Sequence, residues 1–168
     1  SIQDISNTIK YLEKMKVRKN KLTLLHCISD YPANEEDLNL SAIQLLKEKF
    51  KLKIGFSDHS KGNLASIVAT TLGAEVIEKH ITLNKKMLGP DHSSSMNEKE
   101  FKKFLKIIRN TEIVIGKKIK EVTKNEKKNF KMVKRSVFLN SDIKKGEKFK
   151  IEDFVLLRPR KKLKSINW

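Results

Sequence analysis

Short apolar runs alternate with helical segments over the first 90 residues, and this alternation constrains the fold more than any other feature of the sequence. The apolar runs occupy 21–28, 52–56 and 74–81. The helical periodicity of apolar residues covers 3–19, 40–50 and 63–72. Strands that are separated by helices of about ten or more residues pair in parallel, because the chain must cross over between them. The sequence therefore predicts three parallel βα units, and the run at 21–28 is apolar enough for a strand buried on both faces.

A cluster of polar residues follows each predicted strand. The clusters are Ser29-Asp30-Tyr31, Ser57-Asp58-His59-Ser60 and Glu78-Lys79-His80. The carboxyl ends of the strands form the active face of a (β/α)8 barrel, where the loops carry catalytic and binding residues. Three units make up less than half of an eight-unit ring, so we expect the chain to be a fragment of a longer barrel protein.

The second half of the chain carries different patterns. Apolar spacing predicts a helix over 97–115, with Asn97 as its N-cap, Glu100 at the third helical position and Gly116 as its end. Nine Lys or Arg residues crowd the stretch 117–135, which is typical of a linker. Short strands and turns follow. We therefore expect a barrel segment, a linker and part of a small β-rich domain, over 1–116, 117–135 and 136–168.

The formal net charge of +17 raises the question of nucleic-acid binding. The excess is mostly lysine, and aromatic residues that could stack on bases rarely lie among the basic ones, so we expect no nucleic-acid partner and a surface suited to anionic substrates. Apolar stretches stay below the roughly 20 residues of a membrane span, so we expect no membrane insertion. We recognise no signal peptide, and the single cysteine, Cys27, suits a reducing, cytoplasmic location.

His59 and His80 follow two successive predicted strands. Because neighbouring strand ends lie close together in a barrel, both imidazoles could face one metal ion. Asp58 and Glu78 are candidate acceptors that would orient the two rings. Spacing alone leaves the alternative open, since two histidines at this separation are often unrelated.

A polar loop at 89–95 follows the third predicted strand and contains Asp91. The loop is either a turn that leads to the next helix or a site for sugar hydroxyls, since a carboxylate accepts hydrogen bonds from a polyol. Asp30 and Tyr31, after the first predicted strand, allow the same choice.

Three blocks of residues carry a resemblance to a known family. The blocks 25–32, 55–60 and 76–80, the last followed by Gly89-Pro90-Asp91-His92, resemble the sialic acid synthase family in order and spacing. Members of that family join phosphoenolpyruvate to an N-acylated hexose such as N-acetylmannosamine, giving N-acetylneuraminic, legionaminic or pseudaminic acid and phosphate. The tail from 142 to 159 resembles the family's antifreeze-like (SAF) domain. The resemblance implies an α/β fold, in which the C-terminal three βα units of a TIM (β/α)8 barrel precede the start of a small β-rich SAF (β-clip) domain.

The resemblance also implies roles for individual residues. His59 and His80 match the family's metal ligands, usually for Mn²⁺, with Mg²⁺ as the alternative. Three positions match residues that bind phosphoenolpyruvate in the family: Ser29, Ser57 and Lys134. Many members have Asn at the position of Ser29, and Arg135 is a neighbouring candidate for the role of Lys134. The positions that match the N-acylated hexose site are Tyr31, Asp91 and Arg158, the last reaching the N-acyl group from the partner subunit of a homodimer with swapped SAF domains.

Two departures limit what this chain could do by itself. The family's usual Arg-Pro-Gly is Arg158-Pro159-Arg160 here. The family's catalytic glutamates come from earlier barrel strands, so the catalytic residue is unassigned in this chain and the fragment alone is expected to be inactive. Two alternatives stay open, namely a related phosphoenolpyruvate-dependent aldol synthase that makes an eight-carbon sugar acid, and a non-catalytic, truncated binding module. The SAF-like tail argues against the first.

Overall fold

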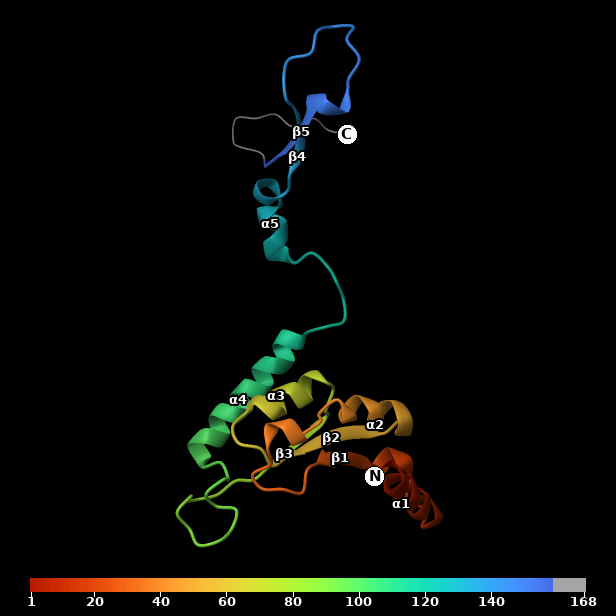
Figure 1. Ribbon diagram of the computed structural model, residues 1–168, viewed down its shortest axis with the longest axis vertical. Coiled ribbons are helices and arrows are strands. Elements are labelled where there is room, and N and C mark those ends of the chain that lie inside the picture. Colours follow the sequence, from red (N-terminus) through yellow and green to blue (C-terminus); the bar gives the residue numbers. More distant parts are fainter. Residues whose placement is uncertain (159–168) are drawn as a thin grey trace. The chain divides into compact units, whose positions relative to one another are not determined.

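The computed structural model describes residues 1–158 and divides the chain into two compact units, with the boundary between Lys117 and Lys118. The first unit contains a three-stranded sheet in the order β1 (Thr23–Cys27), β2 (Lys53–Asp58) and β3 (Val76–Lys79), as Figure 1 shows. Both strand pairs are parallel. The predicted parallel α/β arrangement is therefore confirmed.

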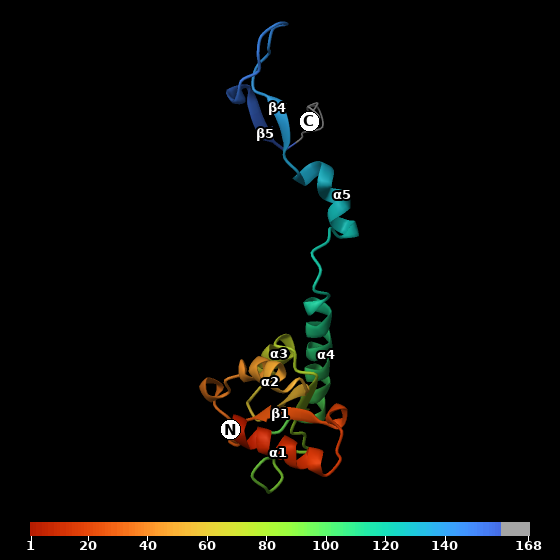
Figure 2. The ribbon, with the colours of Figure 1, turned by 90° about the vertical axis from the view of Figure 1, so that its right-hand side faces the viewer.

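The helices of the first unit are α1 (Ile2–Lys14), α2 (Ala42–Phe50), α3 (Leu64–Thr71) and α4 (Glu98–Ile115), with short 3₁₀ turns at Lys19–Lys21 and Glu35–Asp37. Helices α2 and α3 cover one face of the sheet (Figure 2). Ile54 and Phe56 of β2 are fully buried in this layer together with Ile43 of α2. Each large apolar side chain buried in this way stabilises the fold by about 1.5–3 kcal/mol. None of the helices in residues 1–158 is both long enough and apolar enough to cross a membrane.

Strand β1 corrects one expectation. Its side chains alternate between half-buried and exposed positions, and Leu25 is 38% exposed, so the prediction of a strand buried on both faces is wrong. Successive side chains of a strand point to opposite faces of the sheet, and Leu25 shares the face of Gly55 and Val76, which α2 and α3 do not cover. A run of apolar residues does not reveal whether one face of a strand is covered or two.

The amino end of α4 forms as the sequence predicts. The Asn97 side chain accepts a hydrogen bond from the Glu100 backbone N–H (3.0 Å), and the Glu100 carboxylate accepts one from the Asn97 N–H (2.9 Å). This reciprocal pair satisfies N–H groups that the start of a helix leaves without intrahelical partners. Gly116 ends the helix with φ at +60°, a conformation that residues with a Cβ rarely adopt.

A helix lies inside the segment that the sequence suggests as a linker. Helix α5 (Lys124–Val133) starts at Thr123, whose hydroxyl accepts from the Glu126 N–H, while the Glu126 carboxylate accepts from the Thr123 N–H. These hydrogen bonds lower the pKa of Glu126. The same capping arrangement that starts α4 therefore starts a helix in this lysine-rich stretch.

The second unit also contains a strand pair. Strands β4 (Ser136–Leu139) and β5 (Phe154–Leu157) are antiparallel. Their connection includes a turn closed by the Glu147 N–H on the Lys144 carbonyl (3.1 Å) and a 3₁₀ turn at Ile151–Asp153. The short strands and turns that the sequence predicts after residue 135 are thus present. The departure at Pro159-Arg160 lies outside the described residues.

Gly55 gives a direct test of the sheet geometry. A Cβ at this position would clash with Leu25 Cδ2 and would lie 2.6 Å from the Val76 carbonyl oxygen, which belongs to backbone that cannot rotate away. We expect Gly55→Ala to lower the free energy of unfolding of the full-length gene product that contains these residues by about 1–3 kcal/mol, measured by urea unfolding.

Lys53→Ala is the matched control, because Lys53 lies on the same strand and is exposed. It should change the free energy of unfolding by about 0.5 kcal/mol or less. Equal stability of the two variants would contradict the close approach of Leu25 and Val76 over Gly55.

Candidate functional site

The ends of β2 and β3 bring His59 and His80 together. Asp58 pairs with Lys79 at the last position of the parallel register, so the next residue on each strand is a histidine at the same edge of the sheet. The two ring centroids are 5.2 Å apart, and the ring planes are nearly perpendicular, at 84°. The two histidines that the sequence proposes as a pair are therefore neighbours in space.

Tyr31, which follows β1, contacts both histidine rings. Its ring stacks on His80, with centroids 4.3 Å apart and planes 29° from parallel, and meets His59 edge to face at 5.2 Å. Its hydroxyl lies 3.4 Å from the hydroxyl of Ser95, which is buried and donates to the Asp91 carbonyl (2.7 Å). Residues that follow each of the three strands thus form one cluster.

The His59 ring is oriented by a backbone group. His59 Nδ1 lies 2.9 Å from the carbonyl oxygen of Ile28, which can only accept, so Nδ1 carries the hydrogen. In the neutral ring this leaves the lone pair of Nε2 free for a ligand. The thiol of Cys27 lies beside the same ring, 3.8 Å from Nδ1 and 3.9 Å from Nε2.

The prediction that Asp58 accepts a hydrogen bond from a histidine ring is wrong. Asp58 lies on the other face of the sheet, where its carboxylate accepts from Ser60, Ser66 and Lys79. Glu78 accepts a hydrogen bond from the hydroxyl of Ser57 (2.6 Å). Asp58 cannot orient the His59 ring because side chains alternate between the two faces along an extended chain, so that consecutive residues point in opposite directions.

Asp91 approaches His80 through the long loop after β3. The loop folds back because the Met96 N–H donates to the His80 carbonyl (3.0 Å) and the Thr82 N–H donates to the Met96 carbonyl (2.8 Å). The closest carboxylate oxygen of Asp91 is then 3.8 Å from His80 Nδ1. His80 and Asp91 are 36% and 50% exposed, so this contact is weak and both groups face solvent, where a ligand can reach them.

The other residues proposed from the sequence have separate positions. Ser57 is buried on β2 next to Glu78, and Ser29 is exposed in the loop after β1. Asp30 accepts a local hydrogen bond from the Tyr31 N–H (3.0 Å) in the loop after β1. Two further residues belong to the second unit and are exposed there: Lys134, whose ammonium lies 4.8 Å from the ring centroid of Phe130, and Arg158, which follows β5.

The histidine pair offers a partial ligand set for a metal ion. Two imidazole nitrogens suit a divalent transition metal, and the free Nε2 of His59 fits that use. Within residues 1–158, however, no three His, Cys, Asp or Glu side chains gather closely enough to hold an ion. A divalent ion at this pair would therefore need oxygen ligands from water or from a substrate.

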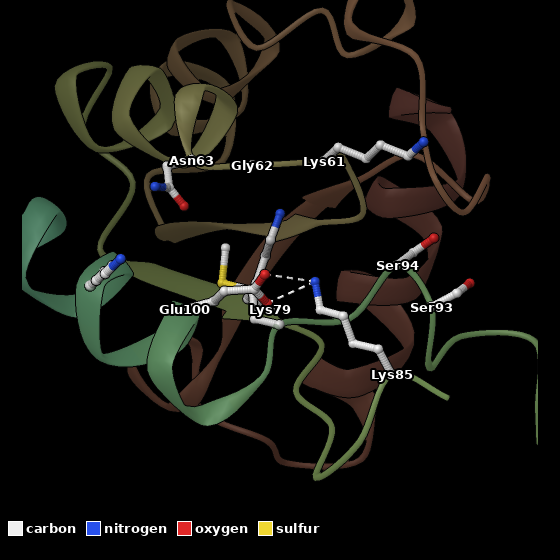
Figure 3. A pocket seen from close by; sticks show the side chains of 10 residues that line it. Lys61, Gly62, Asn63, Lys79, Lys85, Ser93, Ser94 and Glu100 are labelled. Atoms are coloured by element: carbon white, nitrogen blue, oxygen red, sulfur yellow. Dashed lines mark hydrogen bonds and ion pairs between the residues drawn. The ribbon is translucent and has the colours of Figure 1, made fainter. Parts of the chain in front are cut away.

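A pocket of about 360 Å³ lies between the loops after β2 and β3 and the first turns of α4 (Figure 3). Four lysines line it, namely Lys61, Lys79, Lys85 and Lys103, together with Glu100. Figure 3 shows Lys85 reaching Glu100, at 2.8 Å, and this hydrogen bond lowers the pKa of Glu100. Sequence reasoning missed this pocket, because its lysines are far apart along the chain and each one resembles an ordinary surface residue.

Known proteins resemble this chain in sequence. The model of the NeuB family matches residues 1–120. The N,N'-diacetyllegionaminic acid synthase of Campylobacter jejuni is 42% identical over 159 residues, which cover 95% of this chain and 48% of that protein. The pseudaminic acid synthase of the same species is 41% identical over 151 residues, 89% of this chain and 44% of that protein.

A solved structure agrees with these relatives. The N-acetylneuraminic acid (sialic acid) synthetase of Leptospira borgpetersenii matches with a TM-score of 0.68 and 38% sequence identity, over 77% of this chain and 45% of that chain. The chain therefore spans about half the length of the relatives that it matches.

The contact between Tyr31 and His80 can be tested by NMR. Protons of a ring that stacks on an aromatic face resonate upfield, so Tyr31→Leu should move the His80 ring protons downfield. The chain has four histidines and two tyrosines, which makes Tyr11→Leu the matched control, because Tyr11 is 63% exposed on α1. Spectra of histidine-labelled protein with unchanged His80 signals in Tyr31→Leu would contradict the stacked cluster.

Proposed function

The chain belongs to the NeuB family, and on this premise we propose that it forms part of a synthase that condenses phosphoenolpyruvate with an N-acylated hexose, giving a nine-carbon sugar acid and phosphate. The observation that carries the proposal is the cluster of His59, His80 and Tyr31 at the carboxyl ends of three parallel strands. Binding sites of α/β folds occupy this edge of the sheet.

The proposal includes the architecture of the whole protein. The three βα units would be the C-terminal part of a TIM barrel, and the β4–β5 pair would be the start of an SAF domain. The protein would act in the cytoplasm as a homodimer with swapped SAF domains. Support comes from the parallel sheet and from relatives about twice as long as this chain.

A divalent metal ion, Mn²⁺ or Mg²⁺, would be held by His59 and His80. When bound, such an ion supplies Lewis-acid polarisation of the aldehyde oxygen of the open-chain sugar. His59 is prepared for this use, since the Ile28 carbonyl keeps the hydrogen on Nδ1. Tyr31 packs against both rings and so limits their rotation.

The remaining residues would bind the two substrates. The carboxylate of Asp91 can accept hydrogen bonds from sugar hydroxyls next to His80, and Arg158 would reach the N-acyl group. Ser29 and Ser57 would contact phosphoenolpyruvate, while the ammonium of Lys134 would offset its phosphate charge. The groups assigned to the anionic phosphoenolpyruvate are thus neutral or cationic, and the carboxylate of Asp91 is assigned to the sugar hydroxyls.

The reaction would form a bond between C3 of phosphoenolpyruvate and the aldehyde carbon of the sugar. Water adds at C2, and the tetrahedral intermediate then loses phosphate. A group must move protons to the sugar oxygen and from the water. Asp58 is unsuited, because both of its oxygens already accept hydrogen bonds in a buried network. We assign this role to no residue of the described part of the chain.

The histidine pair gives the test of the proposed function. In the full-length gene product, His59→Ala or His80→Ala should lower Mn²⁺-stimulated phosphate release from phosphoenolpyruvate and N-acetylmannosamine by about 100- to 1,000-fold, as expected for several kcal/mol of charge stabilisation. Both rings are only half-buried, so circular dichroism should show the fold retained.

His26→Gln is the matched control. The His26 Nε2 lies 2.7 Å from the Leu38 carbonyl, and a glutamine amide can donate to the same oxygen. This variant should keep its response to Mn²⁺. Full metal dependence in both alanine variants would show that His59 and His80 are structural. An eight-carbon product formed from phosphoenolpyruvate and a five-carbon sugar, detected by mass spectrometry, would favour the alternative aldol synthase.

The 168-residue chain alone should release no phosphate from the same substrates, even with Mn²⁺. The physical reason is that its described site holds groups suited to binding, whereas proton transfer is left without a candidate. Malachite-green detection of phosphate, with the full-length gene product as the positive control, measures this. Steady turnover by the chain alone would contradict the proposal that its catalytic carboxylates lie elsewhere.

A further inference from the structure

One ion pair in the first unit is buried. Lys79 Nζ lies 3.0 Å from Asp58 Oδ2, and the two side chains are 5% and 0% exposed. In every other ion pair within residues 1–158, both side chains are at least 36% exposed. The sequence shows Asp58 and Lys79 only as neighbours of the two histidines.

Every charged atom of this pair has hydrogen-bond partners inside the protein. Asp58 Oδ1 accepts from the backbone N–H of Ser60 (2.8 Å) and from its hydroxyl (2.7 Å), while Oδ2 accepts from Ser66 and Lys79. Lys79 Nζ also donates to the Ser60 carbonyl (2.6 Å). Lys79 is one of the residues that line the pocket in Figure 3, although its ammonium is already bound to Asp58 and to the Ser60 carbonyl.

The network lies directly behind the histidine pair. Asp58 and Lys79 face each other in the last register position of β2 and β3, and each precedes one histidine. Ser60, on the far side of His59, is held through its N–H, its hydroxyl and its carbonyl. His59 is therefore fixed between two anchored residues, and His80 follows a third.

Stability alone does not account for a charged pair at this position. Removing two charges from water offsets most of their attraction, and well-packed apolar residues of similar size are often as stabilising as a buried ion pair. What the pair adds is a defined geometry. The Lys79 ammonium contacts both Asp58 and the Ser60 carbonyl and so ties the end of β3 to the end of β2, while hydrogen bonds from Ser60 and Ser66 hold the Asp58 carboxylate in place. A metal site needs such definition, because ligand distances must hold within about 0.2 Å.

We propose that Asp58 and Lys79 are positioning residues that set the separation of His59 and His80 for a divalent cation, an inference that rests on the proposed function. The pair acts on the opposite face of the sheet from the rings, so it touches neither metal nor substrate. Its effect reaches the rings through the backbone of the strand ends.

The test measures Mn²⁺ affinity without substrates. In the full-length gene product, Lys79→Met and Asp58→Asn should each weaken Mn²⁺ binding about tenfold, followed by the electron paramagnetic resonance signal of the free ion. Lys85→Met is the matched control, since it removes an exposed ion pair with Glu100 from the neighbouring loop. This control should stay within about twofold of the wild-type affinity.

A double variant separates positioning from stability. Each single change leaves one buried charge without its partner and lowers the unfolding midpoint, whereas Asp58→Asn with Lys79→Met removes both charges. We expect the double variant to regain stability while its Mn²⁺ affinity stays weak. Affinity that recovers together with stability, or a double variant that does not fold, would show that the pair acts on the fold and would overturn the proposal.

Two further outcomes distinguish this inference from the proposed function. Wild-type protein that binds Mn²⁺ together with folded variants of unchanged affinity would overturn the positioning role and leave the metal site intact. Wild-type protein that binds no Mn²⁺ would overturn the metal site and, with it, the role of Asp58 and Lys79.

Discussion

Parallel pairing of β1, β2 and β3 is the constraint on which the rest of the first unit depends. It places the carboxyl ends of all three strands at one edge of the sheet, so that residues from separate loops meet there. The register then decides which side chains share a face. A slip of one residue would exchange the two faces of a strand, turning His59 toward the helices and Asp58 toward the site. The burial of Phe56 and Ile54 on the helix-covered face therefore also fixes the position of His59.

The two faces of the sheet have different chemistry. The face covered by α2 and α3 contains the apolar core and one buried ion pair whose charges cancel. The opposite face contains Leu25 and Val76 close over Gly55, and Ser57 bonded to Glu78 nearer the site. In a closed (β/α)8 barrel the second face would be the interior, which layers of side chains fill. A glycine in the middle strand lets side chains from both neighbours occupy the same layer, which is how such an interior accommodates large residues.

Sequence patterns predicted the parts that depend on periodicity and capping, such as the parallel strands and the start of α4. They also placed His59 and His80 at neighbouring strand ends. The capping signal of α5, Thr123 with Glu126, was readable in the same way but was obscured by the density of lysines. The acceptor of His59 was not readable, because the Ile28 group is a backbone carbonyl that every residue type carries. Alternation along β2 could have shown that Asp58 points away from His59, and hence that it belongs to another network.

The distribution of charge connects the surface to the site. A chain with a net charge of +17 attracts anions from a distance, although salt screens this attraction beyond about 8–10 Å. Close to the histidines the balance differs, because Lys79 is neutralised by Asp58 on the far face. The Lys79 ammonium therefore leaves no uncompensated positive charge behind the imidazoles that would repel a metal cation. A lysine-rich surface and the proposed cation site can coexist in one small unit, because the buried ammonium of Lys79 is paired with Asp58 on the opposite face of the sheet from the histidines.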